Sequence, residues 1–191
     1  MSIESAEFRR VLGHFATGVT VITTQHQNQL HGTTVSSFCS LSLDPAQILV
    51  CLDRQATIHE LISASGIFGV NILAEHSETL SRHFAHRVPD KFSGVEYNLG
   101  LLGVPLLEDA LATLECRVVT RYPGGDHSIF IGEVVASGAH AHAAHPLLFF
   151  RSKYSKLHRS VAPLTSGVTN VAKLVNNSTN VTSVVNGTAL D

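Results

Sequence analysis

A stretch rich in hydroxyl side chains is the first feature of this sequence that could do chemistry. It runs from Gly32 to Pro45, and six of the ten residues from Thr33 to Ser42 are Ser or Thr. Hydroxyls and successive backbone N–H groups can together bind a phosphate without a full positive charge. The stretch predicts a site for a phosphorylated ligand, although its composition equally fits an exposed strand with Ser and Thr on the solvent face.

A second feature places an imidazole next to a carboxylate. Pro123-Gly124-Gly125 predicts a turn, and Asp126-His127 follows it at the start of an apolar strand. Asp126 can orient the ring, and His127 can bind a ligand amide or relay a proton near neutral pH. An ordinary hairpin with a polar first residue fits the same residues.

A third feature combines aromatic rings with a cation. Phe84 is followed after a short polar loop by Lys91 and Phe92. Such residues can stack on a planar ring and neutralise a phosphate, or they can form a packed loop in which the lysine stem is buried.

The cysteines and histidines point away from metal and disulfide chemistry. The three cysteines are widely spaced, without a CxxC pair, so we interpret them as buried thiols. His140, His142 and His145 cluster in a polar loop, but no Cys or carboxylate is adjacent. A solvated connection explains this cluster better than a zinc site, and we expect no metal.

Composition limits the class of protein. The 191 residues are 44% hydrophobic and 15% charged, which fits one compact globular domain. A net charge of -2 gives no general attraction to nucleic acid or anionic lipid. The first ten residues lack the pattern of a signal peptide, and no apolar run is long enough to span a bilayer. We therefore expect a cytoplasmic protein without nucleic-acid or membrane partners.

Hydrophobic periodicity predicts the elements that must position these residues. An amphipathic helix is expected over 5–16, and two short helices over 57–64, beginning with a capping box at Thr57, and over 76–85. Strands are expected at 19–24, 47–52, 67–73, 111–122, 127–137 and 147–150, with a polar connection over 25–30 and strand plus loop over 32–43. Because long helices do not alternate with these strands, the pattern favours a mostly β protein with an antiparallel six-stranded barrel.

The chain changes character near its C-terminal end. Residues 1–159 form the predicted domain, whereas 160–191 are rich in Val, Thr, Asn and Ser and nearly without charge. These residue types have poor helix propensity, so the sequence does not decide the conformation of this extension.

Seven segments taken in order resemble the short-chain flavin reductases, the reductase components of two-component flavin-dependent monooxygenases. The resemblance runs from Phe8 to about Tyr154 and implies a flavin mononucleotide-binding split barrel. The segments are FATGVTVITT, GTTVSSFCSLSLDP, ILVCL, FGVNIL, FAHRVPDKF, LECRVVTRYPGGDHSIFIGEV and LLFFRSKY.

The resemblance implies hydride transfer from NADH or NADPH to FAD or FMN, with the chemistry held by the cofactors and alignment supplied by the protein. It implies a nicotinamide site at His127, the catalytic residue, and Tyr154. The flavin-binding residues that it implies are Thr33, Thr34, Ser36, Ser37, Cys39, Ser40, Asp53, Arg54, Ala56, Thr57, Phe84, Lys91 and Phe92.

The resemblance also implies a homodimer and a separate monooxygenase that receives the reduced flavin. Two other functions remain open from the sequence: a split-barrel flavin-binding electron-transfer protein and a pyridoxal phosphate-related oxidase. The Gly-Asp-His turn argues against both. The sequence does not distinguish FAD from FMN, or NADH from NADPH.

Overall fold

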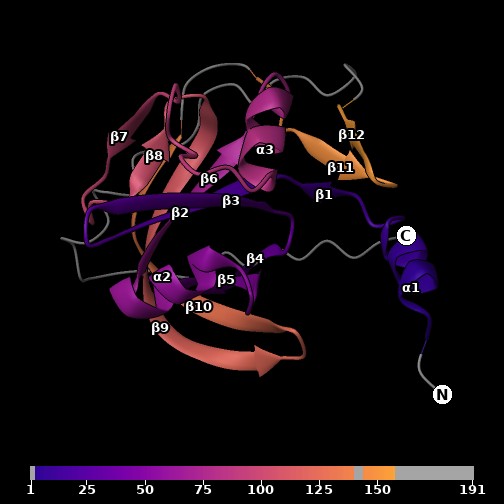
Figure 1. Cartoon of the computed structure of the whole chain (residues 1–191), viewed down its shortest axis with the longest axis horizontal. Helices are drawn as coiled ribbons and strands as arrows, with labels where there is room; N and C mark the ends of the chain where they lie inside the picture. The colour runs from indigo at the N-terminus through magenta and orange to yellow at the C-terminus, as the bar shows by residue number, and fades with distance from the viewer. Residues whose placement is uncertain (1–2, 140–143, 158–191) are drawn as a thin grey trace, which may run out of the picture.

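The computed structural model describes residues 3–139 and 144–157 of the chain (Figure 1). The helices in this part are α1 (Ser5–Leu12), α2 (Thr57–Ser65) and α3 (Glu78–Ala85). The strands are β1 (Thr17–Gly18), β2 (Thr20–His26), β3 (Gln29–Val35), β4 (Phe38–Leu43), β5 (Ala46–Asp53), β6 (Ile67–Leu73), β7 (Tyr97–Leu99), β8 (Pro105–Leu107), β9 (Ala110–Gly124), β10 (His127–Ala139), β11 (Leu148–Phe150) and β12 (Lys153–Ser155).

One large antiparallel sheet dominates the structure. Its strand order is β3-β2-β6-β9-β10-β5-β4, and two smaller sheets contain β1-β11-β12 and β7-β8. The two edge strands of the large sheet, β3 and β4, are consecutive in the chain and are separated only by Ser36 and Ser37. The sheet therefore curls until its edges meet at this connection, which gives the antiparallel split barrel that the sequence predicts.

The inside of the barrel is the main hydrophobic core. Alternate residues of β5 are buried, and they pack with Phe68 of β6, Phe130 of β10 and two residues of α2, Ile58 and Ile62. Helix α2 contacts β2, β3 and β5, so it covers the open side of the curled sheet. Because a side chain at Gly132 would collide with the Phe68 ring, the barrel requires glycine at that position.

A second core lies outside the barrel, between β3 and α3. It contains Phe84 of α3, Phe92 and Leu147, all buried, with Tyr154 at its margin. A Cβ atom at Gly32 would lie 2.6 Å from the Phe84 ring. The glycine that begins the hydroxyl-rich stretch thus lets α3 pack directly on β3.

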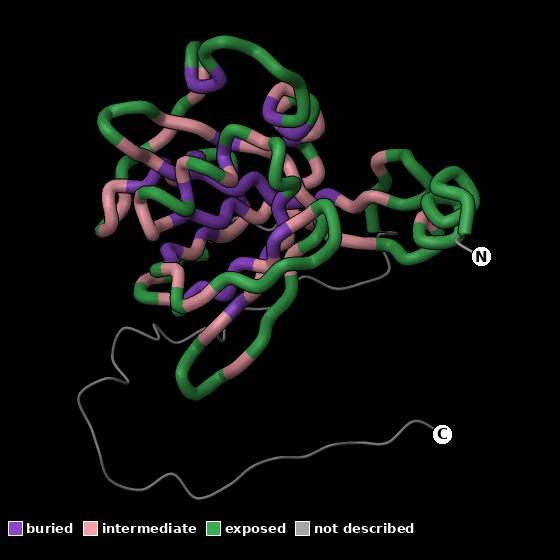
Figure 2. The backbone as a smooth tube through the Cα atoms, turned by 60° about the horizontal axis from the view of Figure 1, so that its bottom comes forward, coloured by how far each residue is buried: buried purple, intermediate pink, exposed green. Residues whose placement is uncertain are grey.

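Helix α1 projects from the barrel with β1, β11 and β12 (Figure 1), and these residues are mostly exposed in Figure 2. None of its residues is buried. The apolar side chains that predicted this helix face solvent, with exposed fractions of 49% for Phe8 and 75% for Phe15. The apolar face of α1 is therefore exposed in the described part of the chain.

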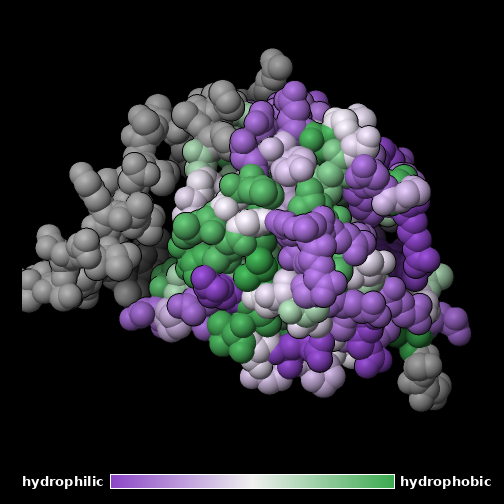
Figure 3. Space-filling model, turned by 60° about the vertical axis from the view of Figure 1, so that its left-hand side comes forward, coloured by the Kyte–Doolittle hydropathy of each residue, from purple (hydrophilic) through white to green (hydrophobic). Residues whose placement is uncertain are grey.

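The β7–β8 connection carries a second exposed apolar region. Leu99 and Leu101 are exposed, and hydrophobic residues gather on the face that comes forward in Figure 3. The buried Glu115 carboxylate accepts the backbone N–H groups of Leu101 and Leu102 at 2.9 and 2.7 Å, which fixes the connection against β9.

Several predicted boundaries need correction. The large sheet has seven strands because the 32–43 segment contributes to both β3 and β4. The first helix ends at Leu12, and the predicted 25–30 connection is only a two-residue turn at Gln27-Asn28, both with positive φ. The predicted extension 160–191 lies outside the described residues.

Candidate functional site

The hydroxyl-rich stretch forms the connection across the split of the barrel. Ser36 and Ser37 join β3 to β4, and both are exposed, as are Cys39 and Ser40. The Ser37 hydroxyl donates to the Cys51 carbonyl of β5 at 2.8 Å, and the Cys51 N–H donates back to Ser37. These bonds hold the connection in a defined shape while Ser36 and Ser40 face solvent.

The end of β5 lies against the β9–β10 hairpin. Asp53 is the register partner of His127, and the Arg54 N–H donates to the Asp126 carbonyl at 3.1 Å. The Asp53 carboxylate accepts the Gln55 N–H at 2.8 Å and shapes the loop before α2. The structure thus brings together Asp53, Arg54 and His127, which the sequence predicted as parts of one site. We call this region the hairpin end of the site.

The imidazole of His127 is oriented by its neighbour. Its Nδ1 lies 2.7 Å from Asp126 Oδ1, and its side chain is 42% exposed. This hydrogen bond lowers the pKa of Asp126 and makes Nδ1 the donor to a carboxylate. Nε2 is then the ring nitrogen available to a ligand.

The hairpin turn begins two residues later than predicted and ends one residue later. Pro123 and Gly124 belong to β9, and the turn residues are Gly125 and Asp126. Gly125 has a φ of 72°, which favours glycine at the first turn position. The prediction that His127 begins the following strand is confirmed.

Thr57 does not cap α2, contrary to the predicted capping box. Ala56 is the N-cap residue, Thr57 is the first helical residue, and no side chain caps the helix. A helix N-terminus without a side-chain cap presents N–H groups to an anion. Arg54, two residues before the N-cap residue Ala56, is exposed and adds positive charge near the N-terminus of α2.

The residues around α3 form a different environment, which we call the α3 end. The Thr34 hydroxyl donates to the Ser81 carbonyl at 2.7 Å, and Ser81 Oγ lies 2.9 Å from the Tyr154 hydroxyl. The Arg82 guanidinium lies 4.7 Å from the centre of the Tyr154 ring. Tyr154 thus lies at the α3 end, and among the described residues no hydrogen bond or ring contact joins it to His127.

Phe84 and Lys91 are placed differently from the predicted ligand-facing pair. Phe84 is fully buried. Lys91 as a residue is 8% exposed, and its ammonium donates to the Phe84 carbonyl at 2.7 Å and so binds the C-terminal end of α3. Burial lowers the pKa of Lys91. Phe92, also 8% exposed, packs edge-on against Phe84. These residues stabilise the second core.

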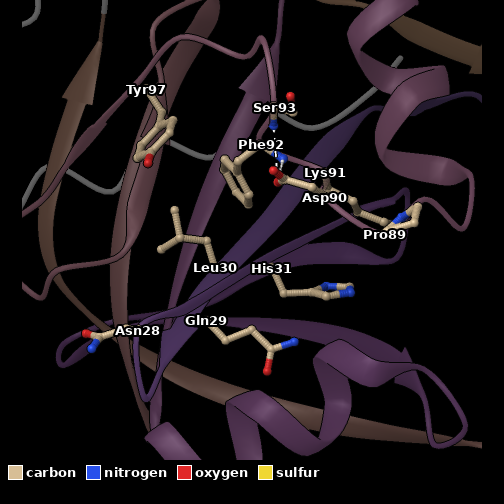
Figure 4. Close-up of a pocket in the computed structure, with 10 residues that line it drawn as sticks. All are labelled: Asn28, Gln29, Leu30, His31, Pro89, Asp90, Lys91, Phe92, Ser93 and Tyr97. Carbon is tan, nitrogen blue, oxygen red and sulfur yellow. Dashed lines mark hydrogen bonds between the residues drawn. The ribbon is translucent and has the colours of Figure 1, made fainter.

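A cavity of about 380 Å³ opens beside Lys91 (Figure 4). One wall is the start of β3 and the other is the loop before β7. The residues that line it are Asn28, Gln29, Leu30, His31, Pro89, Asp90, Lys91, Phe92, Ser93 and Tyr97.

Sequence reasoning missed the contacts that fix α2 beneath the hairpin. His59 Nε2 lies 2.9 Å from Ser128 Oγ, and the His59 ring packs edge-on against Phe130. Arg121 of β9 donates to the Ser63 hydroxyl at 2.7 Å. The His59–Ser128 contact joins residues 69 positions apart, so no local pattern could reveal it.

Two further findings concern metals and membranes. Within residues 3–139 and 144–157, no group of three or more His, Cys, Asp or Glu could hold a metal ion. His140 and His142 of the predicted solvated loop lie outside those ranges. No described helix is both long and apolar enough to cross a bilayer.

The candidate site thus lies on an antiparallel split barrel. Exposed hydroxyls line the split, and a histidine oriented by a carboxylate lies beside them. A flavin reductase like domain matches residues 12–158. The chain is 40% identical over 154 residues to the flavin-dependent monooxygenase reductase subunit HsaB of Mycobacterium tuberculosis, covering 80% of this chain and 82% of that protein.

Two other relatives agree with this match. The chain is 39% identical to the NADH-dependent flavin reductase StyB of Pseudomonas fluorescens, covering 81% of this chain and 91% of StyB. The structure of NADH:FAD oxidoreductase SgcE6 of Streptomyces globisporus C-1027, in complex with NAD and FAD fragments, superposes with a TM-score of 0.79 at 36% identity, covering 83% of this chain and 96% of SgcE6. The chain therefore belongs to the flavin reductase-like family.

Proposed function

We propose that this chain is an NAD(P)H-dependent flavin reductase that reduces FAD or FMN and releases the reduced flavin to a separate flavin-dependent monooxygenase. The observation that supports it most is the hairpin end, where the loop Asp53–Thr57 and the Asp126-His127 pair lie side by side next to the hydroxyl-rich connection. Relatives named as NADH-dependent flavin reductases support the hydride donor.

The residues at the hairpin end suit a flavin phosphate and its ring. The uncapped first turn of α2, the Arg54 guanidinium and the Thr57 hydroxyl offer an anion site, which fits the phosphate. Backbone and hydroxyl groups of Ser36, Ser37 and Ser40, with Thr33 and Cys39, would hold the ring edge. Thr34, whose hydroxyl is bound to Ser81, would act by fixing β3.

When bound, the flavin supplies the acceptor for a hydride from the nicotinamide. The protein aligns the two rings, and this orientation alone lowers the barrier substantially. His127 Nε2 would accept a hydrogen bond from the nicotinamide carboxamide, because Asp126 occupies Nδ1. His127 is thus a positioning group first, and it can also relay a proton.

The roles of Phe84, Lys91, Phe92 and Tyr154 follow their burial. In our proposal these residues support the flavin site from beneath by holding α3 against β3. A nicotinamide contact of Tyr154 would require a second chain to bring it near the His127 of the first.

We propose a homodimer because, among the described residues, two apolar surfaces are exposed or only half-buried. One is α1. The other is the outer face of β5 and β10, where Leu49, Cys51 and Ile129 alternate with core residues and are only half-buried. Two-fold assembly can cover both surfaces. In sedimentation equilibrium, wild type should be a dimer and Phe15→Asp should shift toward monomer, whereas a wild-type monomer at micromolar concentration would contradict the proposal.

We also propose a cytoplasmic location, where NADH is available and cysteines remain reduced. All three cysteines are free thiols, and one of them, Cys39, is exposed.

Steady-state oxidation of NADH and NADPH with FAD, FMN and riboflavin in turn tests the proposed activity. We expect nicotinamide oxidation that depends on added flavin. Tight flavin binding without turnover would indicate an electron-transfer protein instead, and pyridoxine 5′-phosphate oxidation would indicate the oxidase alternative.

A further inference from the structure

We propose that His59, through its contact with Ser128, is a positioning residue that couples the flavin phosphate site on α2 to the placement of His127. This inference rests on the proposed function, because it joins the two ligand sites that the proposed function assigns. It gives a role in the reaction to two side chains that the sequence did not single out.

His59 lies at the end of α2 where the flavin phosphate is proposed to bind. It is the third residue of the helix, which begins at Thr57, and its N–H donates to the carbonyl of the N-cap residue Ala56 at 2.9 Å. A phosphate held by the N–H groups of this turn would fix the backbone that carries the His59 ring. Flavin binding would thus act on His59 without a direct contact between the ring and the flavin.

Ser128 follows His127 at the start of β10, and the two side chains point to opposite faces of the strand. Ser128 lies opposite Leu52 of the core and is 5% exposed, so its hydroxyl is directed into the barrel. His59 Nε2 lies 2.9 Å from this hydroxyl. The contact therefore fixes the backbone of β10 one residue away from His127, while the His127 ring stays accessible on the other face.

The His59 ring is also held by the core. It packs edge-on against the fully buried Phe130 of β10, with 5.2 Å between the ring centres. A close-packed side chain transmits a displacement because it has no free volume to move into. A ring fixed by both Ser128 and Phe130 therefore passes a shift of the first turn of α2 on to β10.

The contact acts by geometry and not by charge. Burial, followed by the positive charge of Arg121, lowers the pKa of His59 from its ordinary value of 6.5. Of the other charged groups around the ring, Arg54 lowers this pKa, and Asp53 and Glu60 raise it. The ring is therefore mostly neutral at pH 7.5, so a neutral side chain that can reach Ser128, such as Gln, can replace it.

A second link between α2 and the hairpin lies farther from His127. Arg121 of β9 donates to the Ser63 hydroxyl at 2.7 Å, and this hydroxyl donates to the His59 carbonyl at 2.7 Å. Arg121 is the register partner of Phe130, three residues after His127. This link holds the same helix against the same hairpin without reaching His127, so its removal is a matched control.

FMN and riboflavin differ only in the phosphate, so they test the coupling. In anaerobic stopped-flow at pH 7.5 and saturating flavin, the dependence of the reduction rate on NADH concentration gives an apparent dissociation constant for NADH. With wild type, this constant should be at least about fivefold lower with FMN than with riboflavin. In His59→Leu and in Ser128→Ala the difference should fall below about twofold, because the phosphate no longer fixes β10.

His59→Gln and Ser63→Ala separate this role from a folding defect. Gln can still hydrogen-bond Ser128, so His59→Gln should keep a difference close to that of wild type. Ser63→Ala removes the link to Arg121 and should also keep it. Urea midpoints and flavin dissociation constants of the four variants show whether each protein is folded and binds both flavins. Ser128→Ala, which removes a single oxygen atom, carries the test if His59→Leu does not fold.

Equal NADH constants with FMN and riboflavin in wild type, or an unchanged difference in Ser128→Ala, would overturn the proposal. An equal fall in Ser63→Ala would do the same, because any loosening of α2 would then be sufficient. If wild type reduces flavin and one of these results is found, only the role of His59 fails. If wild type oxidises no NADH with any flavin, the proposed function fails.

Discussion

The hairpin end and the α3 end contain similar residue types and use them in opposite ways. At the α3 end, Lys91 and Phe84 are buried, and the Lys91 ammonium is bound to the protein's own backbone. At the hairpin end, Arg54 is exposed and His127 is partly exposed, and the groups that could contact a ligand remain accessible. Side chains whose partners lie inside the fold stabilise it, whereas those without internal partners can act on ligands.

The largest effect that would test this difference is at Phe84. Replacing this fully buried ring with Ala should lower the free energy of unfolding by about 3–5 kcal/mol, because it leaves a cavity between α3 and β3. Urea unfolding measures the loss. Leu43→Ala, at a side chain 94% exposed, is the control and should stay within about 0.5 kcal/mol of wild type. A small effect at Phe84 would mean that the α3 end is not a core.

Lys91→Ala should be next in size. Loss of the charge-assisted hydrogen bond to the Phe84 carbonyl should lower the free energy of unfolding by about 1.5–3 kcal/mol. The measurement is the urea midpoint, with the exposed Lys156→Ala as control. If Lys91→Ala is as stable as wild type but binds flavin more weakly, Lys91 binds the ligand and does not stabilise the fold. That result would contradict the proposed difference between the α3 end and the hairpin end.

Arg54→Ala should show the opposite pattern. Because this side chain is exposed, its loss should leave the unfolding midpoint unchanged while weakening flavin affinity about three- to tenfold through loss of one phosphate contact. Fluorescence titration with FAD and FMN measures the affinity. Arg87→Ala, another exposed arginine, should bind both flavins as wild type does, and unchanged affinity in Arg54→Ala would remove the phosphate assignment.

The smallest effect concerns pH and His59, the half-buried histidine beneath the hairpin. Burial, with a further contribution from Arg121, lowers the pKa of His59 below its ordinary value of 6.5. The unfolded chain then binds the proton more tightly, so this contribution to stability is complete above about pH 6.5 and is lost as the pH falls toward the folded-state pKa.

His59→Gln, which can still bind Ser128 but cannot titrate, should therefore lose less stability between pH 7.5 and 5.5 than wild type. Urea midpoints at the two pH values measure the difference. His86→Gln, at an exposed position, should keep the wild-type slope; an equal slope in His59→Gln would contradict the role of His59.

Much of the fold could be predicted because its long elements carry strong local patterns. The β-branched apolar run of β6 predicts Ile67–Leu73 with its observed bounds. Strands β1, β7, β8 and β12 have two or three residues each, too few to show any periodicity. The capping box failed because Thr57 lies inside the helix, where the preceding loop, held by Asp53 and the hairpin, sets its start.

The site was only partly predictable, for a related reason. Asp126-His127 and the hydroxyl-rich stretch are contiguous, so sequence alone indicates their chemistry. Burial is a property of the whole fold. The sequence therefore shows that Lys91 is a cation, but it could not show that the Lys91 ammonium is bound to a carbonyl group of α3.

The most direct test of the central claim is anaerobic stopped-flow reduction of pre-bound flavin by NADH in His127→Ala, with urea unfolding of the same protein. The account predicts at least about tenfold slower reduction or a raised apparent Michaelis constant for NADH, with flavin affinity and the unfolding midpoint nearly unchanged. His127→Asn should recover much of the rate if the ring positions the nicotinamide, and none if it transfers a proton. Wild-type kinetics in both variants, or a large loss of stability, would contradict the claim that the hairpin end acts on ligands.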